Sequence, residues 1–319
     1  MRSQAPSERI PVLFIAGTGR SGSTILDRVI GMNSGFCSLG EMRNIWKLSF
    51  RDNHLCGCGA PFLECEFWNE VCRRAFGVAA PEVDAEEMLR LQRSVDRVRY
   101  VPWLTSARSP AAYRRALSEY GGVLTRLYGA ALAVSGKRVL VDSTKDPTQA
   151  LLLSRLPAFE VRAVHLVRDP RATAFSWQRV RQHPGVHSKR QHMEVYPARS
   201  SAARWTFYNG LSELLSRSAA SYLRVRYEDL LAEPEEVLSR VIAPYQPEGG
   251  APVLAESDRV DLAPSHTVSG NPVRFQHGKL KLKVDDEWKA AMPARDKAVV
   301  SAITLPLLLR YGYRLGTAT

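Results

Sequence analysis

The chain has 319 residues, 45% of them hydrophobic, which is enough to bury the core of one large α/β domain or two small ones. Its formal net charge of +12 favours polyanionic partners such as a nucleotide, nucleic acid or a membrane surface. No apolar run approaches the roughly 18 residues of a transmembrane helix, and no signal-peptide cleavage site follows the first one, so we expect a cytoplasmic protein.

The first predicted element is a buried parallel strand over Val12–Ala16, where five apolar residues run without a break. A glycine-rich loop follows, and Ser23–Met32 then carries apolar residues at helical spacing. Strand, loop and helix in this order open nucleotide-binding α/β folds. Residues 52–110, with a charged helix around Glu82–Arg99, interrupt the pattern and are predicted to form an insertion near the acceptor site.

Three further strands are predicted, over Arg138–Val141, Val161–Val167 and Tyr222–Val225. The segments of helical character around them are Pro110–Val134, Ala172–Val180 and Ala198–Ser218. Strands that alternate with helices predict an α/β fold, with a parallel central sheet flanked by helices on both faces. Because ligands bind beyond the carboxyl ends of such strands, we expect the polar residues that follow each strand to converge on one site.

Residues 181–199 are polar and basic, which predicts a loop or lid. Its histidines His183, His187 and His192 are interpreted as solvated lid residues rather than metal ligands. The adjoining cations either form a solvated face or orient an anionic acceptor: Arg179, Arg181, Lys189, Arg190 and Arg199.

The loop after the first strand reads Gly17-Thr18-Gly19-Arg20-Ser21-Gly22-Ser23-Thr24 and is typical of an anion-binding turn. Its glycines let backbone N–H groups approach an anion, and the following helix N-terminus adds a favourable dipole. The hydroxyls of Ser21, Ser23 and Thr24 can donate to phosphate oxygens. An ATP-binding P-loop has Lys directly after the second glycine, whereas Ser23 stands there in this chain.

This loop resembles the 5′-phosphosulfate loop of the sulfotransferases that use 3′-phosphoadenosine-5′-phosphosulfate (PAPS). Arg168, with Ser176 eight residues on, matches the 3′-phosphate signature of that family. Tyr227, in the segment RYEDL, matches a tyrosine beside the nucleotide, although it equally fits ordinary packing. The segment HTVSGNPVRF over His266–Phe275 resembles a loop that closes over the nucleotide, which implies phosphate contacts from Arg274 and Lys279.

The resemblance spans roughly residues 12–290 and implies a P-loop NTPase-like fold without a metal. It predicts one sulfotransferase domain over residues 1–319, with the cysteine-containing insertion at about 52–110 and a nucleotide-closing loop at about 262–290. The resemblance also implies that Gly19, Arg20 and Gly22 bind PAPS. After transfer the nucleotide product is 3′-phosphoadenosine-5′-phosphate.

The predicted catalytic residues are Glu41, Lys145 and Arg20. In the tyrosylprotein branch of the family a Gly-Glu pair supplies the base, which implies that role for Glu41 and a nearby place for Arg43. The alternative is a structural ion pair of Glu41 with Arg43 or with another buried arginine. Lys145 matches a lysine that stabilises or protonates the bridging oxygen, and Arg20 would share the developing charge.

The predicted function is transfer of a sulfuryl group from PAPS to a hydroxyl of a small molecule, sugar, lipid or phenol, by in-line displacement. One alternative is a P-loop-type small-molecule kinase using Mg-ATP, and another is a non-catalytic polyanion binder. No nucleic-acid motif is present, so no nucleic-acid partner is predicted. Acceptor identity and oligomeric state, including a homodimer, stay open.

Five cysteines lie outside these motifs: Cys37, Cys56, Cys58, Cys65 and Cys72. An odd number argues against a disulfide framework. Structural zinc commonly uses cysteines two to four residues apart, whereas one residue separates the first pair here. The sequence leaves open a metal, a redox pair and reduced thiols, and no metal belongs to the predicted site.

Overall fold

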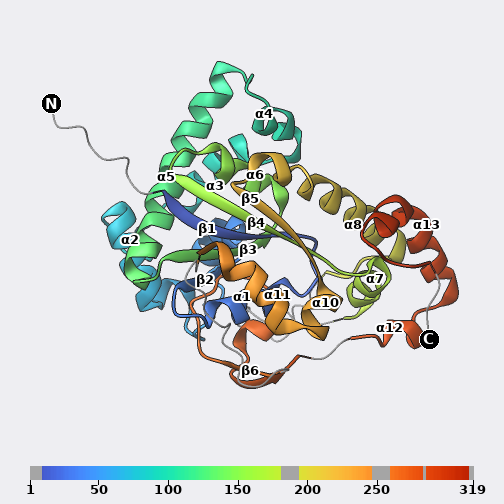
Figure 1. Cartoon of the computed structure of the whole chain (residues 1–319). Coiled ribbons are helices and arrows are strands. Elements are labelled where there is room, and N and C mark those ends of the chain that lie inside the picture. Colours follow the sequence, from blue (N-terminus) through green and yellow to red (C-terminus); the bar gives the residue numbers. More distant parts are fainter. Residues whose placement is uncertain (1–8, 181–193, 246–258, 283–284, 316–319) are drawn as a thin grey trace.

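The computed structural model describes residues 9–180, 194–245, 259–282 and 285–315, and its centre is a five-stranded parallel sheet (Figure 1). The strand order is β2-β3-β1-β4-β5. The strands are β1 (Ile10–Gly17), β2 (Phe36–Gly40), β3 (Val139–Lys145), β4 (Phe159–Val167) and β5 (Ser221–Arg226). The predicted α/β fold class is confirmed. Four of the strands were predicted from the sequence, and β2 was missed.

Strand β1 lies in the middle of the sheet, where Val12 pairs with Leu140 on one side and Val161 on the other. Its side chains alternate between the two faces, so that Leu13 packs in one hydrophobic cluster and Phe14 in another. Both are fully buried, because helices cover both faces of the sheet. An unbroken apolar run is the sequence signature of that double burial.

One face of the sheet packs against α1 (Ser23–Gly31), α10 (Tyr227–Ala232) and α11 (Pro234–Ile242). The helices and turns that contribute to the cluster on the other face are α2 (Glu66–Phe76), α3 (Ala85–Val95), α4 (Val101–Thr105), α5 (Ala111–Ser135), α6 (Pro147–Arg155) and α9 (Leu215–Ser218). Between β2 and α2 the chain forms a 3-10 turn (Met42–Asn44) and a π-helical segment (Ile45–Arg51).

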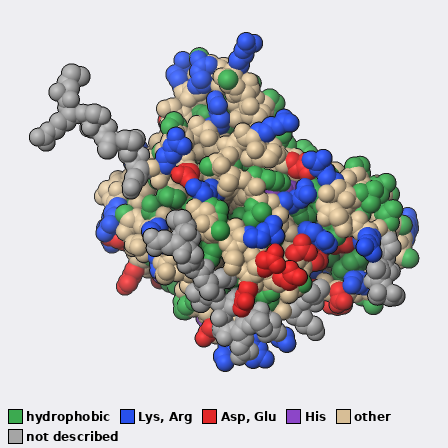
Figure 2. All heavy atoms as spheres, viewed as in Figure 1, with side chains coloured by type: hydrophobic (Ala, Val, Ile, Leu, Met, Phe, Trp, Pro, Cys, Tyr) green, Lys and Arg blue, Asp and Glu red, His purple; other side chains and the backbone are tan. Residues whose placement is uncertain are grey.

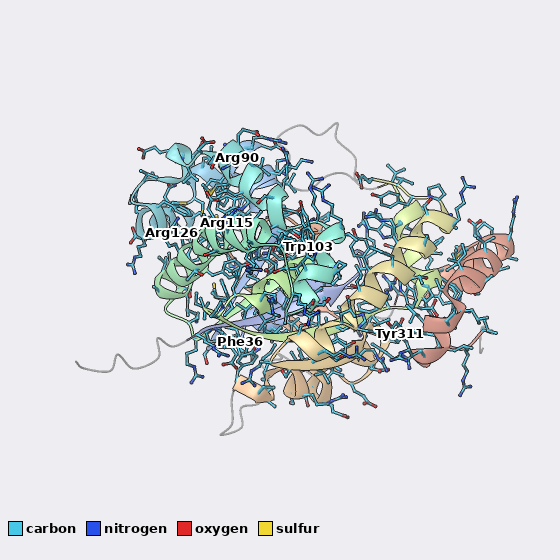
Figure 3. All side chains as sticks on the ribbon, turned by 90° about the horizontal axis from the view of Figure 1, so that it is seen from above. Phe36, Arg90, Trp103, Arg115, Arg126 and Tyr311 are labelled. Carbon is cyan, nitrogen blue, oxygen red and sulfur yellow. The ribbon has the colours of Figure 1, made fainter. Side chains whose placement is uncertain are left out.

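A third group of helices lies beside the sheet (Figure 1). It consists of α7 (Pro170–Gln178), α8 (Ala198–Ser212), α12 (Trp288–Ala291) and α13 (Ala294–Arg310). Within this group Leu308 and the following Tyr311 pack in one cluster with Val167 at the end of β4. Seen from above, Tyr311 lies at this end of the molecule, while Arg90, Arg115 and Arg126 lie toward the other end (Figure 3).

A small antiparallel pair, β6 (Arg259–Leu262) and β7 (Gly278–Lys281), contributes Val260 and Leu262 to the cluster around α1. None of the helices in the described ranges is long and apolar enough to cross a membrane. The predicted lid lies mostly outside the described residues, because 181–193 are not among them.

The predicted insertion at 52–110 packs directly on the sheet. Trp68 and Cys72 belong to the same hydrophobic cluster as Val12 and Phe14 of β1. Its charged helix is α3, shorter than predicted, and α2 was not predicted. Residues 52–110 therefore share a hydrophobic core with the strands whose carboxyl ends carry the polar loops.

Candidate functional site

The glycine-rich loop joins β1 to α1 and is held in place by two aromatic rings. Gly22 has a φ of 90°, and a methyl group there would lie 2.3 Å from Cε2 of Tyr227. A methyl group on Gly19 would lie 2.6 Å from Cζ2 of Trp177. Only glycine combines the left-handed backbone at position 22 with this close approach. The first N–H groups of α1 have no carbonyl partner within the helix and can meet an anion.

A cavity of about 540 Å³ opens beside this loop and gathers the predicted residues from five strand ends. The predicted residues that line it are Gly19, Arg20, Gly22, Ser23, Thr24, Glu41, Lys145, Arg168, Ser176 and Tyr227. The expected convergence at the carboxyl ends of the strands is therefore observed. Ser21 is fully buried beneath the loop, where its hydroxyl donates to the Thr18 carbonyl at 2.8 Å.

Arg168 directly follows β4 and is only 6% exposed, and its guanidinium makes contacts on several sides. Its guanidinium donates to the Arg20 carbonyl at 3.1 Å and lies 4.7 Å from the centre of the Tyr227 ring. It also pairs with the carboxylate of Asp285 at 3.1 Å. Buried Ser176 on α7 lines the same cavity. The cation is thus fixed in position, and its partner Asp285 is partly exposed at the cavity wall.

Glu41 and Lys145 form a direct ion pair in the cavity, with side chains about 15% exposed. Glu41 follows β2, and its second carboxylate oxygen accepts from the Asn44 amide at 2.9 Å. Lys145 ends β3 with a φ of 70°, a strained value for a residue with a side chain, and its Nζ also donates to the Ser143 carbonyl at 3.0 Å. The pair puts a proton acceptor and a cation side by side.

Arg43 pairs with two aspartates rather than with Glu41. Its guanidinium contacts Asp96 at 2.6 Å and Asp146 at 3.2 Å. Asp146 also caps α6 by accepting from the Thr148 N–H. These contacts anchor the segment that carries Glu41.

Two buried acids lie under the site and were not predicted to be perturbed. Burial raises the pKa of Asp27 on α1 to about 7, and Asp27 accepts from the Ser143 hydroxyl at 3.1 Å. Burial also raises the pKa of Asp142 to about 6. Asp142 lies on β3 and accepts from the Tyr128 and Thr144 hydroxyls at 2.7 and 2.6 Å.

The C-terminal closing loop reaches the cavity, but through different residues from those predicted. Ser269, Gly270 and Asn271 line it. Arg274 is 1% exposed, lies outside the lining, and donates to the Thr267 carbonyl at 2.8 Å. Lys279 lies on β7 with its side chain exposed and also outside the lining. Neither residue lines the cavity, and their phosphate contacts stay predictions.

A second cavity of about 370 Å³ adjoins the first and shares part of its wall with it. The residues common to both walls are Gly19, Glu41, Asn44, Lys145, Trp177 and Glu194. Arg204, Trp205 and Tyr208 line only the second cavity. The Glu41–Lys145 pair thus lies where two ligands could meet. Sequence reasoning missed Trp177 and Asp285, which stand in no recognisable motif.

The comparison that decides the family is a match over residues 11–245 to the sequence model described as "Sulfotransferase family". The chain belongs to the sulfotransferase family. The match covers the sheet from β1 to β5 and every predicted site residue except those of the C-terminal loop. No curated protein matches the chain significantly.

Two solved structures show that the sulfotransferase fold extends over nearly the whole chain. The sulfotransferase domain of the Synechococcus PCC 7002 olefin synthase matches with a TM-score of 0.51 and 18% identity, covering 99% of this chain and 100% of that domain. The sulfotransferase domain of the curacin biosynthetic pathway matches with a TM-score of 0.51 and 19% identity, covering 97% and 100%. The fold is thus the P-loop NTPase-like fold of sulfotransferases.

Proposed function

We propose that this sulfotransferase takes its sulfuryl group from PAPS and transfers it to a hydroxyl acceptor. The observation that carries the proposal is that two elements able to bind anions line one cavity: residues of the loop over Gly17–Thr24, and Arg168 with Ser176. PAPS carries anionic groups on both its 5′ and 3′ oxygens, so it needs both elements. ATP has no 3′-phosphate and would leave the second element without a ligand.

The 5′-phosphosulfate would lie at the N-terminus of α1, within reach of the backbone N–H groups and the hydroxyls of Ser23 and Thr24. The 3′-phosphate would bind Arg168 and Ser176. Arg168 already faces a carboxylate, that of Asp285, at 3.1 Å. The phosphate would replace that carboxylate, because two anions cannot share one guanidinium without repulsion.

The reaction would take place between the two cavities. The acceptor oxygen forms a bond to sulfur while the bond from sulfur to the bridging phosphate oxygen breaks, and the acceptor proton passes to Glu41. Lys145 and Arg20 would stabilise the negative charge that develops on the leaving phosphate. In the structure Lys145 is paired with Glu41, so the arriving phosphosulfate would draw Lys145 away and leave Glu41 able to accept a proton.

The kinase alternative is not favoured, because the position of the P-loop lysine is held by Ser23 at the start of α1. The polyanion-binding alternative lacks a supporting surface on the face drawn in Figure 2. There the Lys and Arg side chains lie in scattered groups, and acidic side chains gather over α10. A nucleic-acid footprint would instead be a continuous basic stripe.

The proposal is tested with sulfur-labelled PAPS and a panel of phenols, sugars and lipid alcohols, in buffer containing EDTA. We expect label to reach at least one acceptor class with the wild-type protein and none with Glu41→Gln. Folding of the variant is checked by thermal unfolding. Transfer of phosphate from Mg-ATP to the same acceptors, with no transfer from PAPS, would contradict the proposal.

A further inference from the structure

Three cysteines and one histidine form a compact cluster away from the cavity. The ligand atoms of Cys56, Cys58, Cys65 and His266 all lie within 4.8 Å of one another. The first three come from the turns before α2, and His266 comes from the C-terminal segment, 201 residues after Cys65. Cys37 and Cys72 are not part of this cluster.

The spacing of these atoms fits a tetrahedral metal. The Sγ atoms of Cys58 and Cys65 are 3.8 Å apart, and Nδ1 of His266 lies 3.3 Å from Cys65 Sγ and 3.9 Å from Cys56 Sγ. A zinc ion with ligands at about 2.3 Å for sulfur and about 2.0 Å for nitrogen gives tetrahedral edges of about 3.8 Å between two sulfurs and about 3.5 Å between sulfur and nitrogen. A disulfide would instead bring two sulfurs to about 2.0 Å.

The backbone is shaped to present these side chains. The Cys56 N–H donates to the Ala60 carbonyl at 2.8 Å, and the Gly59 N–H returns to the Cys56 carbonyl at 2.9 Å, which forms a tight turn around Cys58. At Gly57 a methyl group would lie 2.4 Å from Oγ1 of Thr267. Glycine at this position lets the segment that carries His266 approach the turn closely.

Neighbouring residues hold His266 in place, and a buried arginine lies next to the cluster. The imidazole stacks on the Phe67 ring at 4.7 Å, and the Trp68 indole donates to the His266 carbonyl at 2.9 Å. Three thiolates and a neutral imidazole around a divalent ion carry a net charge of −1. Buried Arg274 donates to the carbonyls of Leu55 and Thr267, which directly precede and follow ligand residues. With a metal bound, this negative charge would lie near the Arg274 guanidinium.

We propose that Cys56, Cys58, Cys65 and His266 bind a structural zinc ion. Thiolate and imidazole ligands favour zinc, and four protein ligands leave no open position for catalysis. This inference goes beyond the proposed sulfotransfer and assigns a role to cysteines for which the sequence leaves open a metal, a redox pair and reduced thiols.

The zinc would fasten the closing loop to the rest of the protein. From His266 the chain pairs with the end of β2, where the Val268 N–H donates to the Leu39 carbonyl and the Glu41 N–H donates to the Val268 carbonyl, both at 2.8 Å. The next residue, Ser269, lines the cavity. Metal binding therefore holds both the loop and the backbone of Glu41, although the ion itself lies outside the cavity.

The test is the metal content of the full chain, purified in a reducing buffer without added nucleotide and measured by elemental mass spectrometry. We expect one zinc per chain. Replacing zinc with Co²⁺ should give the intense visible bands and the sulfur-to-metal charge transfer of a tetrahedral thiolate site. Cys58→Ser should lose the metal, while the control Cys37→Ser keeps it. His266→Cys supplies a fourth thiolate and should also keep it.

Removing zinc with a strong chelator should increase amide hydrogen exchange over residues 265–271 more than over the central strands. A wild-type protein that contains no zinc, takes up no Co²⁺ and has five titratable thiols would overturn the proposal. So would a Cys58–Cys65 disulfide, or a Cys58→Ser variant that keeps as much zinc as Cys37→Ser. Because no nucleotide is used, failure here would leave the sulfotransfer proposal intact.

Discussion

Replacing Arg168 with Ala should weaken binding of 3′-phosphoadenosine-5′-phosphate sharply. The guanidinium is 6% exposed, fixed by the Arg20 carbonyl and by the Tyr227 ring, so it pays little ordering entropy when it binds a phosphate. Loss of a charge-assisted contact at such a site costs about 2–4 kcal/mol, or about 30- to 900-fold in Kd. In the wild type the phosphate must displace Asp285 from Arg168, which reduces this expected loss. The reduction is at most about 1 kcal/mol, because the Asp285 carboxylate is 37% exposed.

The assay is calorimetric titration with 3′-phosphoadenosine-5′-phosphate, with adenosine 5′-monophosphate as the matched ligand that lacks only the 3′-phosphate. The variant should lose affinity for the first ligand and change little for the second. Equal losses for both ligands would refute the assignment of Arg168 to the 3′-phosphate, because they would point to a general disturbance of the cavity.

Three further predictions follow from the same geometry. Glu41→Gln should abolish turnover without weakening nucleotide binding, measured by labelled transfer and calorimetry, because it removes the proton acceptor and leaves Lys145 available to the phosphate. Asp285→Asn should tighten nucleotide binding by about two- to fivefold, because the competing carboxylate on Arg168 is lost; weaker binding would contradict that competition. Asp27 holds its proton in the folded state up to about pH 7 but releases it near pH 4 when unfolded, so the free energy of unfolding should fall by about 4 kcal/mol as pH rises through that window. Denaturant titrations at several pH values should show a flatter profile for Asp27→Asn, and an unchanged profile would count against the shift.

The parts of the site that the sequence predicts are those set by local pattern and parallel topology. A glycine-rich loop between an apolar strand and a helix is contiguous in sequence, so its residues could be placed directly. Arg168, Lys145 and Tyr227 follow or end strands, and parallel strands bring their carboxyl ends to one edge. That is why these residues meet in one cavity.

The parts that the sequence misses depend on contacts between distant segments. Strand β2 reads Phe-Cys-Ser-Leu-Gly, too short and too mixed to be recognised, although it positions Glu41. The position of the Arg274 side chain depends on its hydrogen bond to the carbonyl of Leu55, which is 219 residues away. The cysteine cluster shows the same difficulty, because its fourth member, His266, stands far along the chain and in another motif.

The most direct test of the donor assignment is calorimetric titration of the wild-type protein with 3′-phosphoadenosine-5′-phosphate, ADP and Mg-ATP. We predict that the 3′-phosphorylated nucleotide binds at least tenfold more tightly than ADP in the presence of EDTA, since the contact to Arg168 is worth at least about 1.4 kcal/mol. Binding of Mg-ATP in preference to the 3′-phosphorylated nucleotide, with affinity lost on adding EDTA, would contradict the account.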